Sequence, residues 1–241
     1  MIDLNNYKNK IIAHRGIHDN EKIPENSLKA FKLTIDKNIP IELDIHLTKD
    51  NELVVFHDDN LKRMTGIDKN IEQLTIEEIK KYKLLNTKEE IPTLKEVLKL
   101  VNKKVLIDIE IKGTNRIKKL IDVLLDQLND YAGEIIIKSF NPAVIRELKK
   151  KTKKYKVGLL VSKNTNNKLY NLLSKTNLLI PLSKPDFLAI SKKIIKEKNI
   201  QKYLTTYPIL VWTIKTQEEI DYLNNKDFIY ISNNLPFKKG K

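Results

Sequence analysis

Short runs of apolar, mainly β-branched residues alternate along the chain with longer segments in which apolar residues recur at helical spacing. The apolar runs predict eight strands, which begin at Lys10, Pro40, Val105, Glu134, Tyr155, Asp186, Ile209 and Phe228. The amphipathic segments predict helices over residues 26–38, 94–101, 115–129, 142–150, 167–173, 192–202 and 217–224. Such regular alternation of strands and helices is typical of a parallel sheet.

Eight repeats within 241 residues favour a closed barrel over an open doubly wound sheet. No glycine-rich loop follows the first strand, so a nucleotide-binding unit is not indicated. The expected fold class is therefore α/β, a (β/α)8 TIM-type barrel formed by residues 1–241 as a single domain. A short extended piece at 52–56 is expected to pair locally. The polar, lysine-rich stretch 58–92 is expected to be a small insertion after the second strand, with a short helix at 76–82.

In a barrel of this kind the catalytic groups lie at the carboxyl ends of the strands, where polar residues should interrupt the apolar pattern. The first strand ends at His14 and Arg15, and the extended piece leads into His57. Imidazole is the side chain best matched to proton transfer near neutral pH. Two histidines could serve one bond cleavage, one accepting a proton from the nucleophile and the other protonating the leaving oxygen.

Carboxylates interrupt the next strands in the same way. Glu42 and Asp44 alternate with apolar residues, so the period of two places them on one face of their strand, and Glu110 lies at a similar depth on the following strand. Burying such charges without partners would cost several kcal/mol each. Mg²⁺, Mn²⁺ or Ca²⁺ would neutralise them through the hard oxygen ligands that these cations prefer. The cation and Arg15 would then stabilise charge on a phosphoryl group.

Each of these residues also has a structural explanation. A single histidine at a strand end is more often structural than catalytic, and Glu42 and Asp44 could form salt bridges. Asn26 is as likely to be a helix cap as a site residue. His18 and His46 are expected to be structural, because the mechanism needs neither. It is the joint occurrence of the histidines and carboxylates at one predicted barrel mouth that favours a catalytic site.

Composition narrows the range of partners. The net charge of +14 is compatible with a nucleic-acid partner, but only four of the 45 basic residues are arginine, the residue that base readout and bidentate phosphate binding favour. A solvated lysine surface and no nucleic-acid partner are therefore expected. The absence of cysteine excludes disulfides, thiolate metal sites and a cysteine nucleophile. Without a signal peptide or an apolar run of about 18 residues, the sequence predicts a cytoplasmic protein with no transmembrane segment.

Taken together, the motifs resemble those of the glycerophosphodiester phosphodiesterase family. The resemblance rests on IIAHRGIHDNEKIPENSLKAF and the following IELDIHLTKDNELVVFHDDNLKRMTG, and on IDIEIK at 107–112, IKSFNP at 137–142 and VWTI at 211–214. It runs in order along essentially the whole chain. It departs from the family pattern at Ser232 and Asn233, where a Thr-Asp pair is usual, and at Ser27, where Thr is common.

The resemblance implies a TIM-barrel hydrolase that converts a glycerophosphodiester and water to glycerol 3-phosphate and an alcohol. It also implies a general acid/base pair, three ligands to one Mg²⁺ or Ca²⁺ ion, and two phosphate-binding cations. The implied acid/base pair is His14 and His57, and the implied metal ligands are Glu42, Asp44 and Glu110. The implied phosphate-binding residues are Arg15 and Lys112. Phe140 and Trp212, at strand ends, are either core aromatics or walls of the substrate pocket.

Two competing functions remain open at this level. The first is a lysophospholipase D-like or inositol phospholipase-like enzyme, whose substrate carries an acyl chain and whose basic surface would make weak contact with anionic membranes. The second is a non-catalytic basic protein that binds a polyanion. The preferred metal, the identity of the acid and base, the attacking group (water or the glycerol 2-hydroxyl) and the oligomeric state also stay open.

Overall fold

The computed structural model describes residues 2–163, 179–224, 227–233 and 235. The chain divides into two compact units, one formed by Ala13–Glu134 and the other by Met1–Ile12 with Ile135–Lys241. They are called the 13–134 unit and the 135–241 unit below. Each predicted strand is present within two residues of its expected limits, and the extended piece at 52–56 is a ninth strand.

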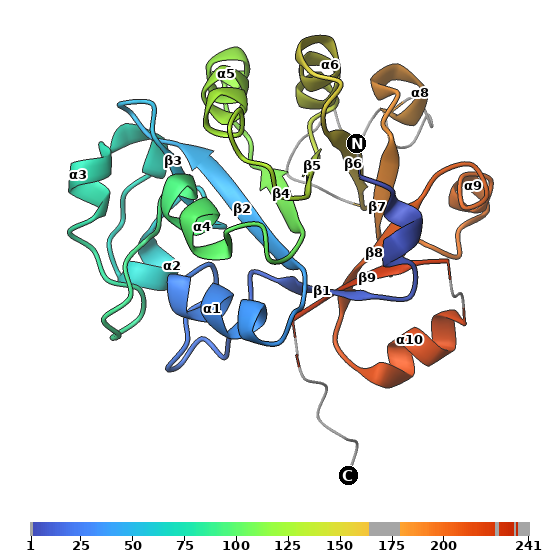
Figure 1. The fold of residues 1–241 in the computed structure, drawn as a ribbon, viewed down its shortest axis with the longest axis horizontal. Coiled ribbons are helices and arrows are strands. Elements are labelled where there is room, and N and C mark those ends of the chain that lie inside the picture. The colour runs from blue at the N-terminus through green and yellow to red at the C-terminus, as the bar shows by residue number, and fades with distance from the viewer. Residues whose placement is uncertain (1, 164–178, 225–226, 234, 236–241) are drawn as a thin grey trace. The chain divides into compact units, whose positions relative to one another are not determined.

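The 13–134 unit is built around three parallel strands and one antiparallel strand (Figure 1). These are β1 (Ile11–His14), β2 (Ile41–Leu47), β4 (Ile107–Ile111) and the antiparallel β3 (Leu53–Val55). Both β1 and β4 pair with β2, in a register that places His14 opposite Glu42 and Asp44 opposite Glu110. Residues that are far apart in the sequence are thereby brought to one level of the sheet.

Capping side chains mark where three helices of this unit, α1, α3 and α4, begin. Ser27 is the N-cap of α1 and accepts a hydrogen bond from the backbone N–H of Ala30. Thr93 caps α4 in a reciprocal capping box with Glu96. The helical segments are α1 (Leu28–Asp36), α2 (Lys62–Thr65), the 3-10 turn η2 (Ile71–Gln73), α3 (Ile76–Ile79), α4 (Leu94–Val101) and α5 (Ile117–Gln127).

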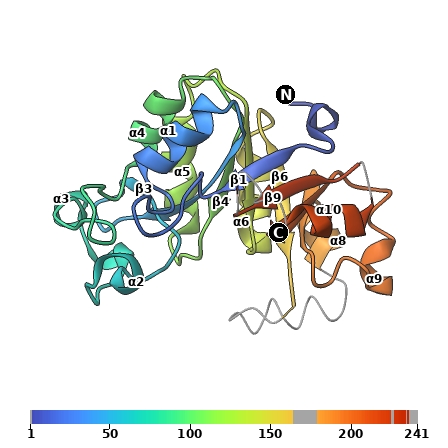
Figure 2. The same cartoon turned by 90° about the horizontal axis from the view of Figure 1, so that it is seen from below.

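The segment predicted to be a polar insertion has a buried apolar cluster of its own. Its members come from β3, from the short helices α2 and α3 beside it (Figure 2), and from the turns between them. They are Val54, Phe56, Leu61, Met64, Ile71, Leu74, Ile79, Leu84 and Ile91. The sequence pattern concealed this cluster because most of its apolar residues are spread among polar and charged ones without a regular spacing. The limits of the insertion, 58–92, stay a prediction.

The 135–241 unit consists of five parallel strands in sequential order with helices between them. Its strands are β5 (Ile135–Ser139), β6 (Lys156–Val161), β7 (Phe187–Ser191), β8 (Ile209–Ile214) and β9 (Ile229–Ser232). Its helical segments are the 3-10 turn η1 (Leu4–Tyr7), α6 (Pro142–Lys151), α8 (Leu179–Ser183), α9 (Lys198–Gln201) and α10 (Gln217–Leu223).

Two helix predictions differ from this arrangement, and the first is the helix expected at 76–82, which ends at Ile79. The segment 192–202 was expected to be one helix, but only its last part, α9, is helical. The adjacent residues Ile194 and Ile195 are both buried, and the side chain of Gln201 donates a hydrogen bond to the carbonyl of Ile195, so turns replace the first half. The helix expected at 167–173 lies outside the described residues. Within the described ranges, no helix has the length and apolar character needed to cross a bilayer.

Close packing between β6 and β7 leads to a stability prediction. Gly158 lies opposite Phe187 in the register, and a Cβ atom at Gly158 would lie 2.2 Å from a ring carbon of this fully buried phenylalanine. We expect Gly158→Ala to lower the free energy of unfolding by about 1–3 kcal/mol, because the core must shift to admit the methyl group. Urea denaturation measures this difference.

The matched control is Gly113→Ala, since nothing lies within 4 Å of a Cβ atom at that position. Its unfolding free energy should stay within about 0.5 kcal/mol of that of the unmodified protein. Equal effects of the two substitutions would contradict the packing argument.

Candidate active site

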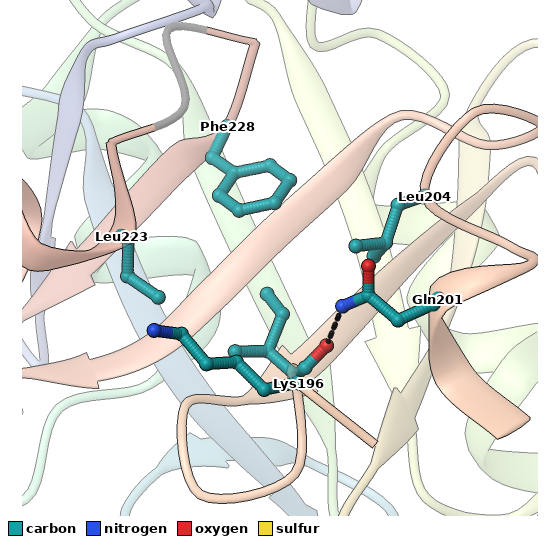
Figure 3. A pocket seen from close by; sticks show the side chains of 6 residues that line it. Lys196, Gln201, Leu204, Leu223 and Phe228 are labelled. Carbon is teal, nitrogen blue, oxygen red and sulfur yellow. Dashed lines mark hydrogen bonds between the residues drawn. The ribbon is translucent and has the colours of Figure 1, made fainter. Parts of the chain in front are cut away.

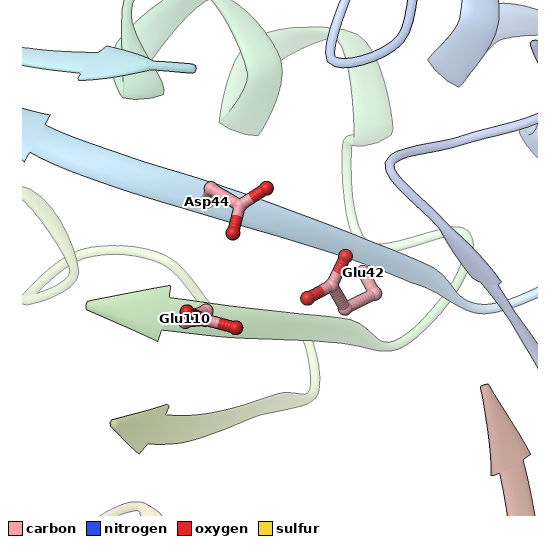
Figure 4. A group of neighbouring side chains, drawn as sticks. All are labelled: Glu42, Asp44 and Glu110. Carbon is pink, nitrogen blue, oxygen red and sulfur yellow. The ribbon is translucent and has the colours of Figure 1, made fainter. Parts of the chain in front are cut away.

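Three carboxylates meet on adjacent strands of the 13–134 unit. Glu42 and Asp44 extend from β2 and Glu110 extends from β4, and one oxygen of each lies within 4.8 Å of the others. Figure 4 shows the three side chains close together on these two strands. All three residues are buried. The structure thus brings together the three residues predicted to bind a metal.

Two cations lie against this cluster. The Lys112 Nζ atom is 2.9 Å from Glu110 Oε1 and 3.3 Å from Asp44 Oδ1, and Arg15 Nε is 3.4 Å from Asp44 Oδ2. Burial alone would raise the pKa of Asp44, but the charges of Lys112 and Arg15 lower it well below its usual range. Asp44 is therefore a carboxylate at neutral pH.

The donor set suits a hard divalent cation. The cluster offers only carboxylate oxygens, which Mg²⁺, Mn²⁺ and Ca²⁺ prefer to nitrogen or sulfur. Three acidic side chains face two basic ones, so the group as a whole carries excess negative charge. Burial would lower the pKa of Lys112, but Glu110 and Asp44 raise it, so this ammonium stays charged beside the cluster.

Arg15 and Gly16 form a left-handed turn after β1, and this turn directs a backbone N–H toward the carboxylate cluster. Arg15 and Gly16 have φ values of 59° and 75°, and the backbone N–H of Arg15 donates to Glu42 Oε2 at 3.1 Å. A Cβ atom at Gly16 would lie 3.0 Å from backbone and side-chain atoms of Ala30, so glycine is required there. His14, at the end of β1, has its Nε2 atom 3.9 Å from Glu42 Oε2. The predicted residues His14 and Arg15 therefore border the carboxylate cluster.

His57 is the second predicted proton carrier, and it follows β3. Its Nδ1 atom lies 2.6 Å from Asp58 Oδ1, and Asp58 Oδ2 accepts a hydrogen bond from Arg63 Nε at 2.6 Å. Burial would raise the pKa of Asp58, but the hydrogen bonds from Arg63 and His57 lower it. Because ionised Asp58 can only accept, the neutral imidazole carries its proton on Nδ1 and its lone pair on Nε2.

Asn26 contacts the site in a way that the sequence left undecided between a helix cap and a site residue. The cap of α1 is Ser27, whereas Asn26 Nδ2 donates to Asp44 Oδ2 at 3.0 Å. The backbone N–H of Asn26 donates to the carbonyl of Arg15 at 2.9 Å, and its φ of 56° is left-handed. Asn26 thus joins the turn after β1 to a predicted metal ligand.

The two remaining histidines have structural contacts. His46 is buried on β2, with Nε2 3.3 Å from the carbonyl of His57. Burial and the charge of Lys112 lower the pKa of His46 to about 4, so it is neutral at physiological pH. His18 lies with Nδ1 2.9 Å from the carbonyl of Gly16. Both therefore contact the backbone beside residues of the site.

The two predicted aromatic residues belong to the 135–241 unit. The rings of Phe140 and Trp212 pack edge to face with centroids 5.7 Å apart, and Trp212 Nε1 donates to the carbonyl of Ala189 at 2.8 Å. Their place in the wall of a substrate pocket stays a prediction. Lys138 on β5 is also buried, and sequence reasoning overlooked it. A lysine within an apolar strand was the signal that could have identified it.

A cavity of about 490 Å³ in the 135–241 unit is lined by none of the residues predicted for the active site (Figure 3). It is lined by Ile195, Lys196, Gln201, Leu204, Leu223 and Phe228. Among the residues that the structure describes, the lining side chains are largely apolar and include no histidine or carboxylate. The cavity therefore lacks the groups needed for proton transfer or metal binding.

Comparison with known proteins identifies relatives of the chain. A model of the glycerophosphoryl diester phosphodiesterase family matches residues 14–228. The chain is 39% identical over 164 residues to a glycerophosphodiester phosphodiesterase of Caldanaerobacter subterraneus, across 64% of this chain and 67% of that protein. It is 34% identical over 132 residues to human lysophospholipase D GDPD1, across 49% of this chain and 41% of that protein.

Solved structures show the same fold. An Oleispira antarctica phosphodiesterase in complex with the product sn-glycerol-3-phosphate superposes with a TM-score of 0.81 at 22% identity, covering 95% of this chain and 94% of that one. A glycerophosphodiester phosphodiesterase from Thermotoga maritima gives a TM-score of 0.72 at 26% identity, covering 92% and 93%. The predicted (β/α)8 TIM-type barrel is thereby confirmed. Because the family model spans most of its length, the chain belongs to the glycerophosphoryl diester phosphodiesterase family and is a phosphodiesterase, as the sequence predicted.

Proposed function

We propose that this protein hydrolyses small glycerophosphodiesters to glycerol 3-phosphate and an alcohol, using one divalent cation bound by Glu42, Asp44 and Glu110. The observation that supports this most directly is the buried cluster of these carboxylates, bordered by His14 and Arg15. The Oleispira antarctica phosphodiesterase of the same fold was solved with sn-glycerol-3-phosphate, the product expected here.

The ion, Mg²⁺ or Ca²⁺ with Mn²⁺ as a further candidate, would supply Lewis-acid charge for a phosphoryl oxygen. Arg15 and Lys112 border the same carboxylates and would hold the phosphoryl group by charge-assisted hydrogen bonds. Their positive charges are maintained at neutral pH, since neighbouring carboxylates raise the pKa of both residues. They would therefore stabilise the negative charge that develops during cleavage.

His14 and His57 would move the protons. One histidine accepts a proton from the attacking hydroxyl, whether this belongs to water or to the glycerol 2-hydroxyl, and the other gives a proton to the leaving oxygen. The hydrogen bond from His57 Nδ1 to Asp58 leaves Nε2 to exchange the proton and stabilises the imidazolium that forms. The same pair serves either attacking group.

A lysophospholipase D activity is the second candidate, and the similarity to human lysophospholipase D GDPD1 favours it. Its substrate would present the same phosphodiester to the same residues but would carry an acyl chain. Weak contact with an anionic membrane would then assist binding. A cytoplasmic location and a small-molecule substrate, without a nucleic-acid partner, complete the proposal. Membership of an enzyme family argues against a non-catalytic polyanion-binding protein.

Loss of either proton carrier should abolish turnover without unfolding the protein. We expect His14→Ala and His57→Ala each to lower kcat on glycerophosphocholine by about 10²–10⁴-fold, because one proton transfer is then unassisted. Coupled detection of glycerol 3-phosphate measures kcat, and circular dichroism verifies the fold. His18→Ala is the matched histidine control and should keep wild-type turnover. Near-normal kcat in either of the first two variants would remove that residue from the mechanism.

Chelation tests the metal site and the substrate class together. Excess EDTA should abolish hydrolysis of a panel of glycerophosphodiesters, and Mg²⁺, Ca²⁺ or Mn²⁺ should restore it, because the carboxylate cluster needs the cation to hold a phosphate. The same ions should raise the melting temperature of the wild-type protein but not that of Glu42→Gln/Glu110→Gln. Full activity in EDTA would refute the site, and activity confined to lysophospholipids would support the second candidate.

A further inference from the structure

One arginine of the predicted insertion, residues 58–92 and called the insertion-like segment below, forms hydrogen bonds to two carboxylates at the edge of the proposed site. Arg63 lies on α2, and its Nε atom donates to Asp58 Oδ2 while its NH2 atom donates to Glu25 Oε1, both at 2.6 Å. The two acceptors come from different parts of the chain. A planar guanidinium can hold two carboxylates in fixed directions at once, which an ammonium cannot.

Each carboxylate bonds in turn to a residue with a proposed role in the reaction. Asp58 Oδ1 lies 2.6 Å from His57 Nδ1, and Glu25 Oε1 accepts a second hydrogen bond from Arg15 NH1 at 2.8 Å. Arg63 is therefore connected through Asp58 to the proposed proton carrier His57, and through Glu25 to the proposed phosphate ligand Arg15.

Glu25, one of the two carboxylates bonded to Arg63, is buried and held in place by hydrogen bonds. The Glu25 side chain is 6% exposed, and its second oxygen accepts a hydrogen bond from Asn20 Nδ2 at 2.8 Å. Burial would raise the pKa of Glu25, but the hydrogen bond from Arg63 and the charge of Arg15 lower it to about 2. Glu25 is thus a fixed anion between two arginines.

Arg63 is in turn held by its neighbours. Leu61 and Met64, on either side of it in α2 and its N-cap, are buried in the apolar cluster described above. Arg63 NH1 also lies 3.1 Å from Met64 Sδ. The Arg63 side chain itself is 44% exposed, so its two ion pairs are a weak source of global stability compared with that cluster.

We propose that Arg63 is a positioning residue, which orients His57 through Asp58 and Arg15 through Glu25. The inference rests on the proposed roles of His57 and Arg15. It makes the insertion-like segment part of the active-site framework, because the packing of α2 sets the direction of both side chains. Without Arg63, Asp58 loses the guanidinium that fixes its orientation toward His57. Glu25 loses one of its two arginine partners, so it no longer holds Arg15 in a fixed direction.

The test compares Arg63→Met with Arg63→Lys in the full chain. We expect Arg63→Met to lower kcat about 10²-fold, because a proton carrier displaced by an ångström loses alignment, and to raise KM as Arg15 loses its fixed position. Arg63→Lys should recover part of kcat, since it restores charge but cannot bridge both carboxylates. Both variants should melt within a few degrees of the wild-type protein.

Lys62→Met is the matched control. Lys62 lies on the same helix and forms an ion pair with Asp68 on the surface, with side-chain exposures of 68% and 66%. It should leave kcat and KM unchanged. Wild-type kcat and KM in Arg63→Met would overturn the proposal, and so would equal losses in Lys62→Met and Arg63→Met, which would indicate a general effect of α2.

A readout that is independent of turnover separates this proposal from the proposed function. In ¹⁵N-histidine spectra, with the His57 signal assigned by its loss in His57→Gln, the wild-type protein should show the Nδ1–H tautomer. Arg63→Met should show a mixture of tautomers. An unchanged tautomer would overturn the positioning role even if activity fell. A wild-type protein inactive on every diester would refute the proposed function, while the change of tautomer would still establish the positioning of His57.

Discussion

The arrangement of the 13–134 unit depends on three carboxylates that are held together away from water. Glu42, Asp44 and Glu110 are stabilised there by Lys112 and Arg15, which lie against them, and by hydrogen bonds from the Asn26 side chain and the Arg15 backbone. Removing either cation would leave buried charge without compensation, which is more costly than the loss of a surface ion pair. The same arrangement places positive groups beside the carboxylates proposed to bind a metal, as binding a phosphodiester would require.

The register of the strands makes this arrangement possible. Parallel pairing places Asp44 beside Glu110 and His14 beside Glu42, so backbone hydrogen bonds fix the separation of the ligands before any metal binds. The left-handed residues Arg15 and Asn26 then direct a backbone N–H toward Glu42 and a side-chain amide toward Asp44. Replacing groups that hold metal ligands in this way typically lowers metal affinity or activity by about 10–100-fold.

The insertion-like segment connects to the proposed site through α2. Leu61 and Met64 of α2 and its N-cap belong to the apolar cluster, and Arg63 extends from that helix to Asp58 and Glu25. His57 is thus constrained at its ring by Asp58 and at its carbonyl by His46. A segment whose composition suggests a solvated loop therefore has a packed interior and direct contact with the proposed proton carrier.

The sequence alone determined the order of the strands, the barrel and the family, and it predicted the acid/base and carboxylate sets as candidates for the site. It could do so because strand periodicity and motif spacing are local properties that can be read from consecutive residues. It did not reveal the apolar cluster formed by residues between Val54 and Ile91, the partial helix at 192–202, or the contacts of Asn26, Glu25 and Arg63. Those features depend on side chains that are distant in sequence, and only tertiary packing decides which distant charges and apolar groups meet.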